Sequence, residues 1–106
     1  NEVTFVEASR ALAQKMIKEG GASPEQRVAY GYKRATSHDA DAVSVATLLK
    51  GLNERLGFYK VHTDDAKNLI GQGDSKPDAS IDPAELAAYT TTAGVLLNLD
   101  RVVTRD

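Results

Sequence analysis

The fold is decided by residues 81–106, which read IDPAELAAYTTTAGVLLNLDRVVTRD. Asp82, Pro83 and Glu85 stand in the order of an N-cap, a first helical position and a capping-box partner. Apolar residues then recur at a helical spacing almost to the end of the chain. They cover more than half of the helix circumference, which is typical of a helix packed by neighbours on several sides. The sequence therefore predicts a central helix over Pro83–Val103.

Four more helices are predicted from capping and stop signals of the same kind. Thr4 with Glu7, and Ser23 with Gln26, fit capping boxes, and several residues of TSHDADA can cap the third helix. The expected helices are Phe5–Glu19, Pro24–Thr36, Ala42–Val61 and a short one that is capped by Thr63 and ended by Gly71 or Gly73. Gly51 and Gly57, inside the third helix, are expected to permit close helix approach or to mark a bend.

The composition fits one folded domain. Of the 106 residues, 42% are apolar and 26% are charged, which is ordinary for a globular chain with a single hydrophobic core. No segment alternates apolar and polar residues as a half-buried strand would, and no repeat is visible. We predict an all-α fold, a small bundle of about five helices over 1–106 with the last helix at its centre.

Charge and composition exclude several classes of protein. Lys and Arg number 13 against 15 Asp and Glu, for a net charge of -2, without a basic stripe, so nucleic acid is not expected as a partner. The longest apolar run, VLL, falls far short of the roughly 20 residues that span a bilayer. The chain has no cysteine, which excludes disulfides, thiolate metal sites and covalent haem attachment within it. It opens on Asn1, which suggests a piece of a longer protein.

Motifs that resemble catalytic or binding sites are weak. His38 and His62 lack a metal-ligand spacing to a second histidine, so exposed or capping roles are expected. HDADA and DDAKN lack the ladder of an EF-hand loop, and GQGDSK follows a predicted helix where a phosphate loop would follow a strand. The hydroxyls of Thr90 to Thr92 are expected to bond back to their own helix. No catalytic residue, cofactor site or metal site is predicted in this chain.

Asp100 is the most informative polar residue, because it falls near the middle of an apolar sector of the last predicted helix. A buried carboxylate needs a base or backbone donors, and Arg10, Arg27 and Arg34 on the early helices are the candidates. The structural interpretation is an ion pair that anchors the last helix. The functional alternative, a general base or ligand-binding acid, needs a second polar group at the same spot, and Asn98 lies well off that sector.

Three segments, FVEASRALAQKMI, RVAYGYKRAT and DPAELAAYTTTAGVLLNLDRVVTRD, carry a resemblance that spans nearly the whole chain. In order and spacing they resemble the C-terminal region of a planctomycete-type family of proteins, the domain of unknown function fifteen-fifty-three, often found with a cytochrome c-like module. The matching positions of this family's pattern are Glu85, Leu97, Asn98, Leu99, Asp100, Thr104 and Arg105. Departures include Tyr89 where Trp is common, Arg101 where Glu is common, and SHDADAVSV after the second helix.

The resemblance implies part of an exported, periplasmic or cell-surface multidomain protein, with any haem site upstream of this chain. It assigns no chemical role to a residue. The expected function is a non-catalytic helical module that docks in or completes the larger protein, with upstream domains as partners and no cofactor of its own. One alternative is that Asp100 and Asn98 contribute to an active site or ligand site assembled with those domains. A second alternative is self-association through apolar surface left on the last helix.

Overall fold

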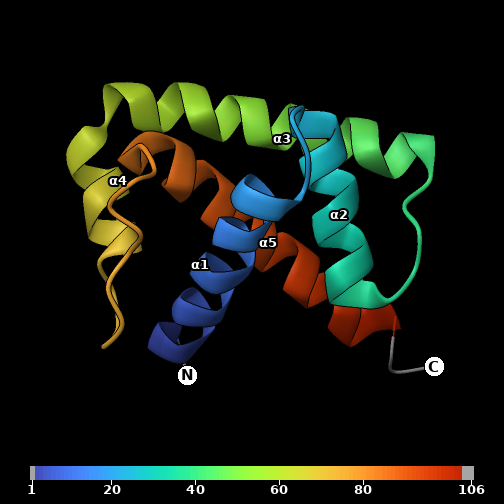
Figure 1. Cartoon of the computed structure of the whole chain (residues 1–106), viewed down its shortest axis with the longest axis horizontal. Coiled ribbons are helices and arrows are strands. Elements are labelled where there is room, and N and C mark those ends of the chain that lie inside the picture. The colour runs from blue at the N-terminus through green and yellow to red at the C-terminus, as the bar shows by residue number, and fades with distance from the viewer. Residues whose placement is uncertain (1, 104–106) are drawn as a thin grey trace.

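The computed structural model describes residues 2–103, and the side chains of residues 2–99 (Figure 1). It contains five α-helices and no β-strand in that range, so the all-α prediction is confirmed. The helices are α1 (Glu2–Glu19), α2 (Pro24–Thr36), α3 (Ala42–Val61), α4 (Thr63–Ile70) and α5 (Pro83–Val103). The predicted bounds of α2, α3 and α5 are those of the structure, while α1 begins three residues earlier than predicted.

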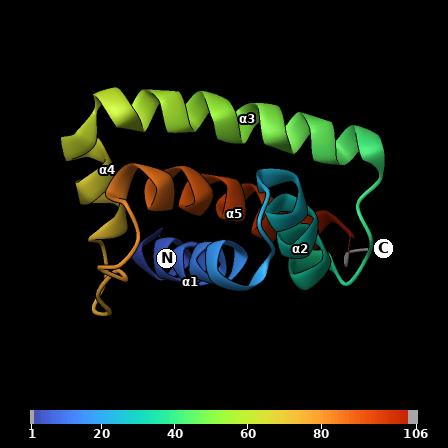
Figure 2. The same cartoon turned by 45° about the horizontal axis from the view of Figure 1, so that its top comes forward.

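Helix α5 is the centre of the bundle and contacts each of the other four helices. Figure 2 shows α5 between α3 on one side and α1 on the other, with α4 near one end and α2 toward the other. Helices α1 and α3 do not meet, because α5 separates them. The radius of gyration is 12.9 Å, close to the value of about 13 Å expected for a compact domain of this length.

The sequence of α5 explains this central position. Its first half is rich in alanine, and these small side chains allow neighbouring helices to approach closely. The larger side chains of Leu86 and Tyr89 fill the space between the helices. The α5 residues of the hydrophobic core are Leu86, Ala87, Ala88, Tyr89, Ala93 and Leu96. Of the α5 side chains up to residue 99, only Asn98 is exposed. The prediction of a central last helix is therefore confirmed.

Local caps fix the starts of three helices. In α2, the Ser23 hydroxyl accepts a hydrogen bond from the Gln26 backbone N–H, and the Gln26 side chain accepts one from the Ser23 N–H, both at 3.1 Å. The Asp41 carboxylate accepts from the Ser44 N–H at 2.7 Å. The Asp82 carboxylate accepts from the Glu85 N–H at 3.1 Å. These bonds satisfy N–H groups that have no partner inside the helix.

Two predicted caps are wrong. Thr4 lies inside α1, because the helix extends back to Glu2, and the Glu7 carboxylate bonds to Ser75 in place of the predicted N-cap. Thr63 is the first residue of α4, and the capping position is occupied by His62, whose side chain makes no capping bond. Because His62 alone separates α3 from α4, the chain has no room for a longer cap. Gly71 follows the end of α4, as one of the two predicted stops.

Close helix approach occurs at a different glycine from those predicted. A Cβ atom added to Gly57 would meet nothing within 4 Å, and one added to Gly51 would meet only the Arg55 side chain. At Gly31 in α2, an added Cβ would lie 2.6 Å from the Met16 sulfur and 2.9 Å from Cδ1 of Leu96. Helix α2 packs against both α1 and α5 here, so the close contact depends on the missing side chain of Gly31.

Candidate functional site

The predicted site residues do not gather at one place among the described side chains. The side chain of Asp100 lies outside the described residues, so its predicted ion pair stays a prediction. Asn98 is exposed. Glu85 is half-buried in the first turn of α5, where its backbone N–H bonds to the Asp82 cap. Glu85 therefore belongs to the start of α5, and Asn98 to the surface near its end.

Arg27 contacts the link between α1 and α2 and also α5, and Arg34 contacts a tyrosine of its own helix, α2. The Nε of Arg27 donates to the Gly21 carbonyl oxygen at 3.0 Å, and its guanidinium lies 5.9 Å from the ring centroid of Tyr89. The guanidinium of Arg34 lies 5.7 Å from the ring centroid of Tyr30. Such cation–π contacts stabilise the packing of partly exposed arginines. Both arginines thus have structural contacts among the described residues.

Arg10, the third arginine considered as a partner for Asp100, is only 2% exposed. One guanidinium nitrogen donates to the carbonyl oxygens of Ile70 and Gln72. The distance from this nitrogen to the Gln72 oxygen is 3.0 Å. The other nitrogen donates to the Ser75 carbonyl oxygen at 2.8 Å and to the Ser75 hydroxyl. Neutral oxygens from the end of α4 and the segment after it therefore satisfy this buried cation.

Arg10 belongs to a row of polar side chains on one face of α1 that holds residues 71–82, here called the connection. The Glu7 carboxylate accepts from the Ser75 backbone N–H and hydroxyl, both at 3.0 Å. Gln14 accepts from the Asp78 N–H at 3.0 Å, and Lys18 forms an ion pair with the Asp78 carboxylate. Residues spaced by three or four share one helix face, so the row follows from the helical period.

Hydrogen bonding shifts the two acidic groups of this row in the same direction. The Ser75 N–H and hydroxyl hold the pKa of Glu7 below its ordinary value. The Lys18 ammonium, with the hydroxyl and N–H of Ser80, holds the pKa of Asp78 well below its usual range. Each of these donors stabilises the charged carboxylate. The partners of this row lie 60 or more residues away along the chain, so they leave no local signal in the sequence.

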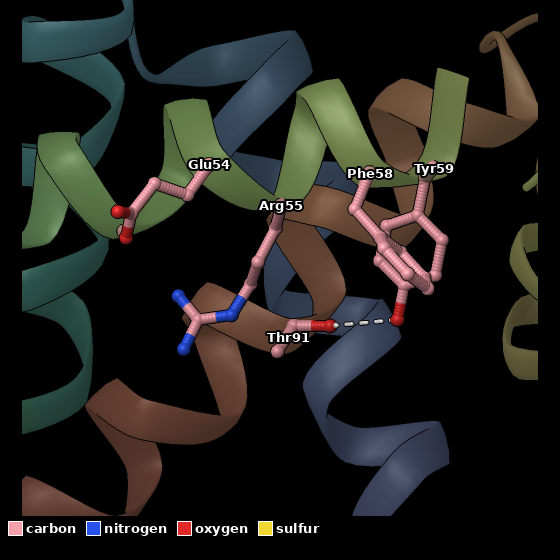
Figure 3. A pocket seen from close by; sticks show the side chains of 6 residues that line it. Glu54, Arg55, Phe58, Tyr59 and Thr91 are labelled. Carbon is pink, nitrogen blue, oxygen red and sulfur yellow. Dashed lines mark hydrogen bonds between the residues drawn. The ribbon is translucent and has the colours of Figure 1, made fainter. Parts of the chain in front are cut away.

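A hollow of about 250 Å³ lies between α3 and α5 and is lined by charged, hydroxyl and aromatic side chains (Figure 3). Arg55 is half-buried there and makes no hydrogen bond or ion pair within the described residues. The Tyr59 hydroxyl lies 3.5 Å from the Thr91 hydroxyl. The lining residues are Gly51, Glu54, Arg55, Phe58, Tyr59 and Thr91. The site is not predictable from the sequence alone, because α3 and α5 supply it together.

Helix α3 also carries most of the large apolar side chains that the described surface exposes. Val43 is 75% exposed, Phe58 48% and Val61 77%, and the fourth such residue is Val3 on α1. The Phe58 ring stacks on His62 at a centroid distance of 4.0 Å and meets the Tyr59 ring edge-on at 5.3 Å. Only Leu52 of α3 is fully buried. Helix α3 thus lies on the surface of the bundle.

The two histidines and the three consecutive threonines differ in their local contacts. His38 and His62 are both exposed, and His62 Nδ1 lies 2.9 Å from the Phe58 carbonyl oxygen. Thr91 donates to the Ala87 carbonyl oxygen at 3.0 Å, as expected for back-bonding within the helix. The buried hydroxyls of Thr90 and Thr92 have no hydrogen-bond partner among the described residues, so the back-bonding prediction is wrong for these two.

Residues 2–103 contain no helix with the length and apolarity to cross a membrane. No group of three or more histidine and acidic side chains within the described range is arranged to hold a metal ion.

Comparison of the chain with protein-family models, curated proteins and solved structures gives no match.

Proposed function

We propose that this chain is a helical docking module, without a cofactor or reaction of its own, that completes a larger exported protein through the outer surface of α3. The observation that supports the proposal is the exposure of Val43, Phe58 and Val61 on that helix. Burial of large apolar side chains against a partner lowers the free energy of the system. Large exposed apolar patches are typical of interaction sites.

The charge of α3 supports a particular kind of partner surface. The helix carries three cations and one carboxylate, although the whole chain has a net charge of -2. Lys50, Lys60 and the carboxylate of Glu54 are exposed, whereas Arg55 is half-buried beside α5. A partner domain with apolar and acidic residues would complement this surface, and charge complementarity favours the correct orientation on docking. If the chain is the end of a multidomain protein, as the sequence resemblance implies, the upstream domains of that protein would be the partner.

The described part of α5 gives little support to self-association through the last helix. Its apolar side chains up to residue 99 are buried or half-buried, and the one exposed side chain is the polar Asn98. Association of this kind needs exposed apolar area on the helix. Helix α3 is the better-supported docking surface.

An NMR titration tests the proposal. The amide spectrum of the ¹⁵N-labelled chain is recorded before and after adding the remainder of the parent protein, produced separately. Docking through α3 predicts shifts confined to one contiguous face of α3, and Val61→Ser should weaken them. Val3→Ser is the matched control, because it removes the exposed valine of α1 and should leave binding unchanged. An unshifted spectrum, or shifts that avoid α3, would contradict the proposed function.

A further inference from the structure

We propose that the hollow between α3 and α5 binds a small monocarboxylate with an aromatic or branched apolar body. The hollow holds about 250 Å³, somewhat less than the 300 to 1,000 Å³ of a site for a drug-sized ligand. It combines a guanidinium, two hydroxyls and two aromatic rings, from Arg55, Tyr59, Thr91 and Phe58. This inference concerns a ligand site and does not depend on the docking of a partner domain.

Arg55 supplies the group that would bind the carboxylate. Its guanidinium donors have no acceptor among the described residues, although the side chain is half-buried. The missing side chain of Gly51 leaves space for it, since an added Cβ there would lie 2.8 Å from a terminal nitrogen of Arg55. A guanidinium with free donors matches a carboxylate in a two-pronged arrangement of hydrogen bonds. The ligand would therefore supply the acceptor that the described protein does not.

Tyr59 and Thr91 offer a second polar contact. The Thr91 hydroxyl already donates its hydrogen to the Ala87 carbonyl oxygen at 3.0 Å. The Tyr59 hydroxyl lies 3.5 Å from Thr91, beyond the usual length of about 2.5 to 3.0 Å for a bond between hydroxyls. Figure 3 shows Arg55 and Tyr59 projecting from α3 toward α5, with Thr91 between them. The bond between Tyr59 and Thr91 is therefore weak, and a carboxylate oxygen held by Arg55 would compete for the Tyr59 hydrogen.

Phe58 supplies an apolar wall. Nearly half of its surface is exposed, and contacts with His62 and Tyr59 fix its ring. A ring held in this way covers an apolar ligand without a large loss of side-chain entropy. Glu54 also lines the hollow, and its carboxylate is directed away from the two aromatic rings (Figure 3). This nearby negative charge disfavours ligands with a second anionic group, so a monocarboxylate fits better than a dicarboxylate or a phosphate.

Phenylacetate is a suitable probe, with phenylacetamide as its uncharged counterpart. Phenylacetate added to the ¹⁵N-labelled chain should cause saturable amide shifts in the second half of α3 and near Thr91, with a dissociation constant on the order of millimolar, as expected for a ligand of few atoms. Phenylacetamide should bind at least about tenfold more weakly, because it lacks the charge that Arg55 recognises. Malonate should also bind more weakly.

Variants separate this site from general surface effects. Arg55→Gln should weaken phenylacetate binding about tenfold, the difference expected from losing one charged contact. Phe58→Ala should also weaken binding. Lys50→Gln removes a cation from the same helix outside the hollow and should leave the affinity unchanged. A dispersed amide spectrum establishes that each variant is folded.

Three outcomes would overturn the proposal. The first is the absence of saturable shifts at tens of millimolar phenylacetate. The second is an equal response to phenylacetamide, and the third is unchanged binding by folded Arg55→Gln. Because none of these measurements involves the parent protein, they are independent of the test of docking.

Discussion

Arg10 illustrates how one buried residue can hold a segment far away in the chain. Its guanidinium donates to three backbone carbonyls, those of Ile70, Gln72 and Ser75. Arg10→Lys keeps the positive charge, but one ammonium cannot reproduce the planar fork of donors. We expect the free energy of unfolding to fall by about 2 to 4 kcal/mol, because buried carbonyls lose their partners. Urea denaturation measures the change.

The matched control for Arg10 is Arg34→Lys, which makes the same replacement at an exposed position of α2. It should change the free energy of unfolding by less than about 0.5 kcal/mol. Similar effects of the two replacements would mean that the bonds of Arg10 to the connection contribute little.

Thr92 shows the opposite situation, a buried polar atom without a bond. Its hydroxyl has no partner among the described residues, and the side chain is 1% exposed. Thr92→Val keeps the shape and removes the unsatisfied hydroxyl, so we expect it to raise the free energy of unfolding by about 1 kcal/mol. Thr91→Val, which removes the bond to Ala87, should not stabilise the chain. Thermal unfolding of both variants measures the change in stability. A loss of stability in Thr92→Val would show that the Thr92 hydroxyl has a hydrogen-bond partner in solution.

At the scale of helices, two glycines have opposite roles. Gly57→Ala fills open space on α3 and should stabilise the chain by about 0.5 to 1 kcal/mol through helix propensity. Gly31→Ala makes the same change where α2 meets α1 and α5, and should destabilise the chain by about 1 to 3 kcal/mol through overpacking against Met16 and Leu96. Denaturant unfolding of the pair measures both. Equal stabilisation by the two would show that the contact at Gly31 relaxes easily.

Helix bounds were predictable from the sequence to the extent that they depend on neighbouring residues. The Ser23 box and the Asp82 cap bond within three positions, and both were predicted. Glu7 was assigned to a cap by the same logic, and it bonds to Ser75 because the fold brings the connection to α1. The role of Gly31 is likewise set by α1 and α5, which the local sequence around it does not specify.

At the scale of the whole molecule, the central position of α5 was predictable because its apolar residues surround the helix. The hollow was not, because Tyr59 and Thr91 meet across 32 positions of the sequence. The periodicity of α3 also does not reveal that Arg55 lacks an acceptor within the described chain. Features that depend on one helix, such as its apolar face, can be predicted from its sequence. Prediction of a site between two helices also requires knowledge of how the helices are placed relative to each other.

The attachment of the connection to α1 makes the stability of the whole fold depend on pH. Glu7 and Asp78 accept hydrogen bonds that only the folded chain supplies, so the folded pKa of each lies below its ordinary value of 4.5 and 3.8, respectively. As the pH falls, the unfolded chain takes up protons on these groups first. Their contribution to stability is therefore complete well above these ordinary values and is lost at lower pH. We expect the melting temperature to fall below about pH 4.5 on this account.

Replacing both carboxylates isolates their contribution. The double variant Glu7→Gln, Asp78→Asn should melt at a lower temperature than the unsubstituted chain at pH 7. Its melting temperature should also fall less between pH 6 and pH 3, because the proton-linked bonds to Ser75 and Lys18 are gone. Glu54→Gln, which removes a carboxylate from α3, should leave the steeper acid dependence in place. Calorimetric melting curves at the two pH values measure these differences. An acid dependence unchanged by the double variant would mean that other groups destabilise the fold in acid, and that the row on α1 holds the connection without linking it to pH.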